Sequence, residues 1–346
     1  MSLALAPFSL LYGAAVRARL ALYSRGLLAR DDVGAPVVSV GNLTAGGTGK
    51  TPLVAWVARA LAADGRRVCV LSRGHGRRDV SSRVVVSDGA RVMAGVEEGG
   101  DEPVMLAEEL LGAAAVVCQA DRAAAARWAR EELGSEVFVL DDGFQHLRLA
   151  RALDIVTVDG TAPWGGGRLL PRGRLREPAS GLRRAGCVVV TRSDMADDLE
   201  GLRAEVSVLT GGRAAVFASR VRVKGLRALG GRGGEVVDSD AAPRSVAALC
   251  AVGNPAAFFE QVRRAGLDLV LERAFPDHHK YTQGELDEVS REAEAVGARA
   301  VLTTAKDAVK LRELSPPLPF YVVETDLEFD DEAALLRLVR EAAGGR

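Results

Sequence analysis

The sequence has no excess of charge of either sign, and it contains few cysteines. Its 346 residues include 45 Lys and Arg against 46 Asp and Glu, so no global field favours nucleic acid as a partner. The cysteines lie in apolar, strand-like runs, and no two have the spacing of metal ligands. We therefore expect reduced core residues in a reducing compartment at Cys69, Cys118, Cys187 and Cys250.

The sequence also lacks an apolar run long enough to cross a membrane. The segment from Leu3 to Val16 is uncharged, but a transmembrane helix needs about 20 apolar residues. Arg17 and Arg19 follow this run, whereas a secretory signal carries its positive charge in front. Residues 1–30 therefore contain either a helix packed on the core or a helix in the membrane interface, with its arginines near anionic headgroups.

Internal repeats are absent, and 346 residues exceed the usual size of a single core, so we expect two domains. In the first part, short apolar strands alternate with helices, and most strands lack polar alternation. This pattern predicts an α/β fold of P-loop NTPase type, with a mostly parallel sheet flanked by helices. The predicted strands are 36–40, 67–72, 114–119, 137–142, 154–159 and 187–192, and the predicted helices are 51–64, 101–111 and 121–133.

The pattern changes at residue 214, where an alternating strand (214–226) precedes a glycine-rich turn (230–235). A second α/β unit follows, with strands 245–253, 269–275 and 299–307, helices 255–265 and 282–296, and a last strand 319–329. We expect the two alternating strands to pair as a linker between the domains. The predicted division is an N-terminal helix (1–30), a core domain (31–213), a smaller α/β domain (214–330) and a C-terminal helix (331–346).

A phosphate-binding loop is predicted by VGNLTAGGTGKTP (40–52), which connects an apolar strand to an apolar helix. Glycines let backbone N–H groups turn toward an anion, and the helix N-terminus adds its dipole. Thr44 stands where the usual P-loop pattern has glycine, but the rest of the pattern fits. Lys50 would reach the β- and γ-phosphates, and the Thr51 hydroxyl would bind Mg²⁺. The candidate nucleotide-binding residues are Gly46, Gly47, Thr48, Gly49, Lys50 and Thr51.

A P-loop needs a further carboxylate for its metal ion, usually at the end of a nearby strand. Asp141 and Asp142 follow the apolar run VFVL directly, where ligands gather in open α/β sheets. A strand-end turn is the alternative, because Asp-Gly is a turn dipeptide. We favour Asp141 as the metal carboxylate, assisted by Asp142.

Other polar stretches suggest an anionic acceptor. Arg73 follows a strand and has the geometry to bind a phosphate, and the loop GRLLPRGRLREP (167–178) is rich in arginine and proline. Both are open to a plainer interpretation as solvated loops. Asp101 begins a helix, where carboxylates also serve as caps, so catalysis and capping are equally good explanations. His278 and His279 follow Asp277, and without further ligands nearby an orienting or catalytic histidine is favoured over zinc.

Taken together, these stretches resemble the tetraacyldisaccharide 4′-kinase family, the kinases of the lipid A pathway. The resemblance covers most of the chain in the family's order, and its motifs are 40–52, LSRGHGR (71–77), GDEP (100–103), LDDGFQH (140–146), 167–178, VGNP (252–255), FPDHHKY (275–281) and TTAKDAVKL (303–311). The resemblance implies ATP- and Mg²⁺-dependent phosphorylation of the 4′-hydroxyl of a tetraacylated disaccharide 1-phosphate. It also implies that the threonine at position 44 belongs to the family's version of the loop.

The resemblance further implies roles for single residues. Asp101 would act on the acceptor hydroxyl, His278 would support it, and Lys50 would complete the catalytic set. Because His279 directly follows His278, the sequence alone leaves open which of the two histidines serves catalysis. The phosphates would be held by Arg73, Arg172, Arg174 and Arg176. Because four acyl chains keep the acceptor in the bilayer, the resemblance favours the interfacial position for the N-terminal helix, at the cytoplasmic face of the inner membrane. The oligomeric state is not determined by the sequence.

Two other classes of function remain possible from the residues alone. A P-loop GTPase or metallochaperone switch would use VVVTRSD (188–194), which is weakly similar to a guanine-reading [NT]-K-x-D pattern with arginine in place of lysine. A cytosolic small-molecule kinase would share the P-loop but would not associate with membranes. Flotation with liposomes separates that class from a lipid kinase.

Overall fold

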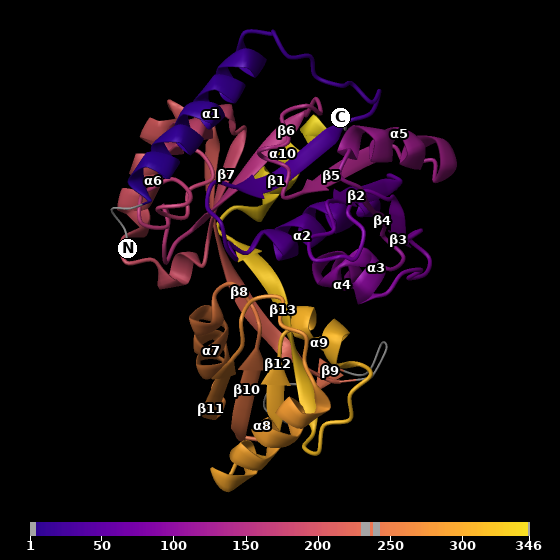
Figure 1. Cartoon of the computed structure of the whole chain (residues 1–346), viewed down its shortest axis with the longest axis vertical. Helices are drawn as coiled ribbons and strands as arrows, with labels where there is room; N and C mark the ends of the chain where they lie inside the picture. Colours follow the sequence, from indigo (N-terminus) through magenta and orange to yellow (C-terminus); the bar gives the residue numbers. More distant parts are fainter. Residues whose placement is uncertain (1–4, 230–235, 238–242, 345–346) are drawn as a thin grey trace.

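The computed structural model of the chain describes residues 5–229, 236–237 and 243–344. Within these residues one continuous sheet passes through both halves of the molecule (Figure 1), in the strand order β11-β10-β12-β13-β8-β7-β6-β1-β5-β2-β4-β3. The fold is mostly parallel α/β, as the sequence predicts.

The first half is built on fully buried parallel strands. They are β1 (Val37–Asn42), β2 (Val68–Ser72), β4 (Ala114–Cys118), β5 (Val137–Asp141), β6 (Leu153–Asp159) and β7 (Cys187–Thr191), and β3 (Val84–Ser87) is added antiparallel at the edge. These strands are almost uninterrupted apolar runs because helices cover both faces of the sheet. The four cysteines are buried and unpaired, as expected.

The covering helices divide between the two faces. Helices α2 (Lys50–Ala63), α4 (Asp101–Glu109) and α10 (Glu332–Ala342) pack into one core, and α5 (Arg122–Glu132) packs into a second core on the opposite face. A third core lies beneath α6 (Leu199–Thr210) and the 3₁₀ helix η1 (Ala179–Arg184). The short α3 (Val96–Gly99) precedes α4, and the 3₁₀ helix η2 (Ser193–Met195) follows β7.

Two long strands connect the halves. The first residues of β8 (Ala215–Ala228) pair parallel with β7, and the rest pair antiparallel with β13 (Phe320–Phe329). A register irregularity between Glu324 and Thr325 interrupts this two-stranded ribbon of β8 and β13. The ribbon therefore belongs to both halves and is the thinnest part of the sheet between them (Figure 1).

The second half repeats the α/β arrangement on a smaller scale. Parallel strands β10 (Ser245–Cys250), β11 (Asp268–Ala274) and β12 (Val301–Thr303) continue the sheet, and β9 (Val236–Val237) pairs with β8. Helix α7 (Pro255–Arg264) covers one face, and α8 (Gln283–Ala295) and α9 (Ala305–Leu311) accompany the other. Helix α10 then returns to the first half. Just before it, Phe329 at the end of β13 packs against Trp56 of α2, with the two ring centroids 4.9 Å apart.

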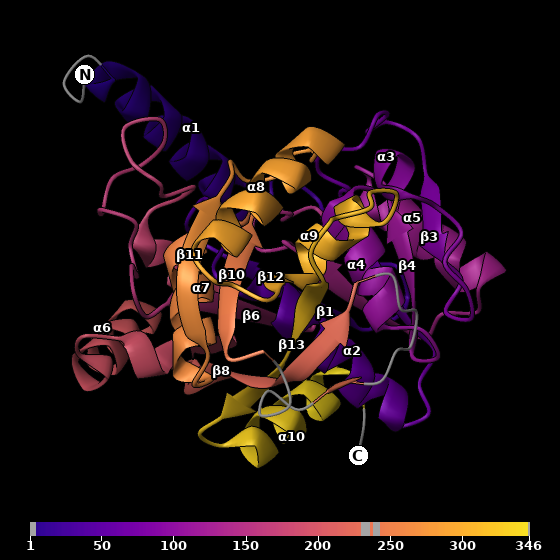
Figure 2. The same ribbon diagram turned by 90° about the horizontal axis from the view of Figure 1, so that it is seen from below.

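Helix α1 (Ala6–Ser24) is joined to the first half by few contacts and projects from it (Figure 2). The Ser9 hydroxyl donates to the Leu169 carbonyl at 2.9 Å and the Tyr12 hydroxyl to the Arg176 carbonyl at 2.7 Å. Its apolar side chains Phe8 and Leu10 are 61% and 72% exposed. In the described part of the chain, no helix has both the length and the apolar character that crossing a membrane requires.

Most predicted elements are confirmed to within a few residues, and the differences have local causes. Residues 299–307 were expected to form one strand, but β12 ends at Thr303 because the Thr304 side chain caps α9 by accepting from the Asp307 N–H at 3.1 Å. Strand β3 and helix α6 lie in segments without a recognisable motif and were not predicted. The glycine-rich turn expected at 230–235 lies outside the described residues.

Candidate active site

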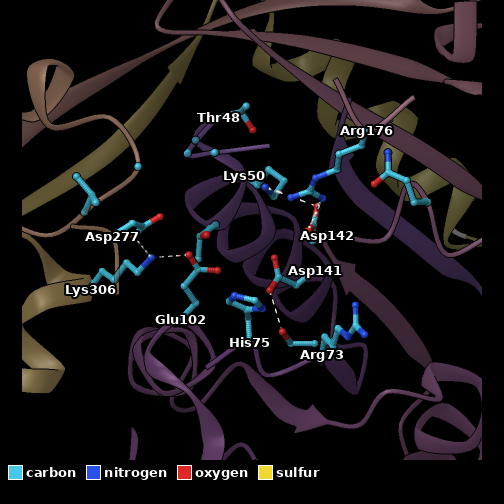
Figure 3. A pocket seen from close by; sticks show the side chains of 18 of the residues that line it. Thr48, Lys50, Arg73, His75, Glu102, Asp141, Asp142, Arg176, Asp277 and Lys306 are labelled. Atoms are coloured by element: carbon cyan, nitrogen blue, oxygen red, sulfur yellow. Dashed lines mark hydrogen bonds and ion pairs between the residues drawn. The ribbon is translucent and has the colours of Figure 1, made fainter. Parts of the chain in front are cut away.

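A cavity of about 1010 Å³ lies between the two halves. The first half contributes the P-loop, the ends of β2 and β5, and the start of α4, and the second half contributes residues 252–253, Asp277, His278 and Lys306. Helix α1 closes one side with Tyr12, Val16 and Leu20. Figure 3 shows Lys50 and Asp142 facing Lys306 and Asp277 across this space.

The P-loop has the backbone that anion binding requires. Gly49 caps α2 in the left-handed region (φ 73°), and Gly46 has φ 116°, so side chains are disfavoured at both positions. Lys50 and Thr51 are the first residues of α2, where free N–H groups and the helix dipole favour a phosphate. Gly46, Gly47, Thr48, Gly49, Lys50 and Thr51 all line the cavity.

The strand ends hold the P-loop in place. The Thr48 hydroxyl is 2.9 Å from that of Thr157, and the Thr191 hydroxyl donates to the Thr48 carbonyl at 2.8 Å. Arg192 donates to the Gly47 carbonyl at 3.0 Å and is paired with Asp159 at 2.5 Å. Because these partners come from neighbouring strands of the sheet, the loop is fixed before any ligand binds.

Two carboxylates stand beside Lys50. Burial, with Glu102 and Asp142 nearby, raises the pKa of Asp141 to about 6. Burial also tends to raise the pKa of Asp142. Lys50 at 3.6 Å and Arg176 at 2.6 Å have the larger effect, so the pKa of Asp142 is lowered. Carboxylate and hydroxyl oxygens are the donors that Mg²⁺ prefers, so Thr51, Asp141 and Asp142 fit this ion chemically. In the described part of the chain, no three Asp, Glu, His or Cys residues are grouped so that they could hold a metal ion by themselves.

The halves meet at Asp101 and His278. Asp101 begins α4 and is 5% exposed, and the Nδ1 atom of His278 lies 2.8 Å from its Oδ2 and 3.1 Å from its Oδ1. An ionised carboxylate only accepts, so Nδ1 carries the proton. Burial opposes the charge of Asp101, but this hydrogen bond and the Lys306 ammonium lower its pKa. The same hydrogen bond raises the pKa of His278.

His279 has a different environment. Its Nε2 lies 3.0 Å from the Glu285 carboxylate and its ring stacks on Phe275, so it stays within the second half. The structure therefore places His278, and not His279, against Asp101. The choice between the two was open in the sequence.

Backbone strain gathers at this site. Among the described residues, the non-glycine residues with positive φ are Asp142 (53°), Arg192 (52°) and His278 (63°). Aspartate tolerates the left-handed region, but arginine and histidine adopt it at a cost of roughly 1–3 kcal/mol. Such strain persists where the surrounding structure holds the residue, as happens at active sites.

The predicted phosphate-binding arginines separate into two groups. Arg73 and Arg176 line the cavity, and Arg176 is held by Asp142. Arg172 and Arg174 are not among the lining residues, and Arg174 donates to the Ala45 carbonyl behind the P-loop at 2.9 Å. Arg174 also lies where a side chain on Gly46 would be, which explains the glycine there.

Several groups at the site were not predicted from the sequence. Lys306 is nearly buried and lies 2.8 Å from Glu102 and 2.9 Å from Asp277, which connects the halves beside Asp101 (Figure 3). Burial and the nearby Arg73 lower the pKa of the Arg122 guanidinium, which lines the cavity. Lys306 belongs to the motif TTAKD (303–307), but only its position against Asp277 and Glu102 reveals a function.

A P-loop and a histidine that line one cavity, with a buried carboxylate holding the histidine, suit the transfer of a phosphoryl group to an alcohol, the chemistry of P-loop kinases. Comparison with known proteins identifies the kind of kinase. A family profile described as tetraacyldisaccharide-1-P 4'-kinase matches residues 1–343. The chain belongs to this family.

Individual relatives agree with the profile. The tetraacyldisaccharide 4'-kinase of Anaeromyxobacter sp. is 50% identical over 315 residues, which cover 87% of this chain and 80% of that protein. That of Geobacter sulfurreducens is 42% identical over 334 residues, 94% of this chain and 89% of that protein. The crystal structure of LpxK from Aquifex aeolicus in complex with ATP superposes with a TM-score of 0.78 and 32% identity, covering 99% of both chains.

Proposed function

We propose that this chain phosphorylates the 4′-hydroxyl of a tetraacyldisaccharide 1-phosphate at a membrane surface, and that Asp101 acts on the hydroxyl. As a member of its family the chain is a kinase of lipid A biosynthesis that uses ATP with Mg²⁺. The observation that carries the residue assignment is the 2.8 Å contact that His278, which lines the cavity with the P-loop, makes with Asp101 across the two halves.

In this proposal Asp101 orients or deprotonates the acceptor hydroxyl. Its lowered pKa keeps it ionised near neutral pH, and the His278 Nδ1–H fixes the direction of the carboxylate. Phosphoryl transfer needs mainly positioning and charge stabilisation, so one carboxylate held in this way is sufficient. Lys306 supplies a further positive charge next to Asp101 and Glu102.

On the nucleotide side, the P-loop backbone and Lys50 hold the phosphate chain. Thr51, Asp141 and Asp142 are the proposed Mg²⁺ ligands, and the ion would neutralise charge on the phosphates. Arg176 is paired with Asp142 in the structure, and it would be free to meet a phosphate if Asp142 held the ion. Arg73 lines the cavity from the end of β2, and Arg172 and Arg174 belong to the loop that supports the P-loop. We therefore assign direct phosphate recognition to Arg73 and Arg176, and an indirect part to Arg172 and Arg174 through that loop.

We further propose that residues 31–213 and 214–330 act as separate domains that close on one another. The ribbon of β8 and β13 connects them, and its irregularity at Glu324 provides a point of bending. In the structure His278 reaches Asp101 and Gly253 lies against Gly47, so this arrangement is the closed one. Closure excludes water and completes the site.

Helix α1 is the proposed membrane contact. Phe8, Leu10 and Leu11 are exposed on a helix that projects from the protein (Figure 2), and Arg17 and Arg19 follow them. An interfacial helix combines such apolar side chains with cations that meet anionic headgroups. Leu3, the first residue of the same uncharged segment, lies outside the described residues. We place the enzyme on the cytoplasmic face of the inner membrane, where its acceptor is held by its acyl chains.

The decisive assay measures transfer of labelled phosphate from ATP to purified disaccharide 1-phosphate. We expect the wild type to label the 4′-position and Lys50→Met to lose this activity. A wild-type protein that hydrolyses ATP but leaves the acceptor unlabelled would contradict the proposal.

Membrane binding has its own test. Phe8→Asp with Leu11→Asp should reduce flotation with anionic liposomes while ATP affinity stays unchanged. Val296→Asp is the matched control, because Val296 is an exposed apolar residue at the end of α8 in the second half. Equal flotation of wild type and the α1 variant would refute the role of the helix.

A further inference from the structure

Most lysines and arginines that line the large cavity have a carboxylate partner. The pairs are Lys50 and Arg176 with Asp142, Arg184 with Glu177, and Lys306 with Glu102 and Asp277. The exceptions in the described part of the chain are Arg19, Arg73 and Arg122. Arg19 lies over the Tyr23 ring of its own helix, so Arg73 and Arg122 are the lining cations that still need a counter-charge.

Arg73 and Arg122 follow neighbouring strands. Strand β2 pairs parallel with β4, where Ser72 lies opposite Cys118, and the Gln119 N–H donates to the Ser72 carbonyl at 3.1 Å. Arg73 comes directly after β2, and Arg122 is the first residue of α5 after β4. Burial lowers the pKa of Arg122, and the positive charge of Arg73 adds to this effect. The two guanidinium groups are therefore near one another.

Arg122 occupies a position that is unfavourable for a cation. It is 7% exposed, its Nε has no hydrogen-bond partner among the described residues, and its Nη1 donates to the Ala120 carbonyl at 3.3 Å. It also lies at the positive end of the α5 dipole. The adjacent Asp121 does not compensate, because it caps α5 and is paired with Arg148 at 3.5 Å. A buried charge in this state costs free energy unless an anion meets it.

The strand order separates the two arginines from the P-loop. Strand β1, which leads into the P-loop, is followed in the sheet by β5, β2 and β4. Because neighbouring strands are about 4.8 Å apart, β2 and β4 lie about 10 and about 14 Å from β1. In Figure 3, Arg73 accordingly lies on the far side of Asp141 from Lys50. An anion between Arg73 and Arg122 is therefore a different group from the phosphates at the P-loop.

The two arginines also lie near the parts of the first half that an acceptor would touch. Burial, Arg122 and, more weakly, Arg19 of α1 lower the pKa of His146 in the cavity wall to about 4, so this imidazole is close to both α5 and α1. The Cys118 thiol at the end of β4 donates to the Gly99 carbonyl at 3.6 Å, which brings β4 to the start of α4. The site thus lies between the proposed membrane helix and the helix that carries the proposed catalytic carboxylate.

We propose that Arg73 and Arg122 form a subsite for the phosphate that the acceptor already carries at its 1-position. The proposal rests on the proposed function, which supplies an acceptor with one phosphate and a 4′-hydroxyl at opposite ends of a disaccharide. A guanidinium group binds two phosphate oxygens at once, and two such groups match the charge of a phosphate monoester. Holding this phosphate away from the P-loop would leave the other end of the disaccharide to meet His278 and the nucleotide.

The test compares two acceptors, the tetraacyldisaccharide 1-phosphate and the same lipid with a hydroxyl in place of the phosphate, in the same mixed micelles. We expect wild type to prefer the phosphorylated acceptor about 10- to 100-fold in kcat/KM. Arg122→Gln should lower kcat/KM about 10- to 100-fold for that acceptor but less than threefold for the other, with the KM of ATP unchanged. Arg73→Gln, at an exposed position, should act in the same direction by about two- to fivefold.

Arg127→Gln is the matched control, because Arg127 is an exposed arginine of the same helix, and it should keep the wild-type preference. An equal loss for both acceptors in Arg122→Gln would overturn the subsite, since it would place the arginine on the transferred phosphoryl group or in the fold. Unchanged kinetics of that variant would overturn it as well.

The comparison of the two acceptors on wild type needs no folded variant. Equal kcat/KM values for both would refute the subsite while leaving the proposed function intact. Failure of the proposed function looks different, because wild type would then label neither acceptor.

Discussion

Replacing Asp101 with asparagine tests the catalytic proposal most directly. The substitution keeps the shape of the side chain and leaves one oxygen to accept from His278, but it removes the charge that His278 and Lys306 face at 2.8 and 3.9 Å. A general base contributes roughly 10²- to 10⁴-fold in rate, or about 3–5 kcal/mol of barrier. We expect kcat to fall by about that factor, while the Kd of ATP changes little because the P-loop is untouched.

The assay is the initial rate of 4′-phosphorylation at saturating ATP and acceptor, with ATP binding measured separately. Asp154→Asn is the matched control, since Asp154 is a nearly buried carboxylate that is paired at 3.2 Å with Arg151 of the same half and not with a residue of the second half. It should lower stability but keep kcat. An Asp101→Asn enzyme that retains the wild-type kcat would refute the assignment of this residue.

Three further substitutions test the geometry. A Cβ on Gly253 would lie 2.6 Å from the backbone nitrogen of Gly47 in the P-loop. Gly253→Ala should therefore hold the halves apart and lower kcat about 100-fold. An unchanged kcat argues against closure. His278→Asn removes the imidazole while keeping a residue that tolerates positive φ. This variant should lower Tm most between pH 3.8 and 6.5, because the raised pKa of His278 and the lowered pKa of Asp101 keep both groups charged in that range. This Tm difference should shrink as pH rises through the raised pKa or falls through the lowered one, and a pH-independent difference contradicts the pairing. Arg192→Ala should lower the free energy of unfolding, measured in denaturant, by about 3–5 kcal/mol, because it leaves the buried Asp159 carboxylate unpaired. Removing Asp159 as well should restore part of this loss. No recovery would mean that the two residues are not coupled.

The fold was largely predictable because its signals are local. Buried parallel strands are uninterrupted apolar runs, and the P-loop follows one of them at a fixed spacing. Strand β3 escaped prediction because it is short and lies at the edge, where pairing with β4 decides its conformation. The end of β12 escaped because a single cap at Thr304 outweighs the apolar pattern.

The site was only partly predictable. Asp101 and His278 were named from the family resemblance, while the residues alone left capping and catalysis equally open for Asp101. Lys306 lies in a motif of the family resemblance, but no role was predicted for it, since a lysine on a helix is ordinary. Its importance comes from the halves meeting, which places Lys306 beside Glu102.

By itself, the sequence determined the class of fold, the phosphate-binding loop and the family, because each depends on residues close together in the chain. Only the tertiary structure decided which histidine meets Asp101 and which arginines face the cavity. Those decisions join residues more than a hundred positions apart, such as His278 with Asp101. Neither residue's local pattern contains the other, so the contact exists only once both halves have folded and the ribbon of β8 and β13 has set their relative position.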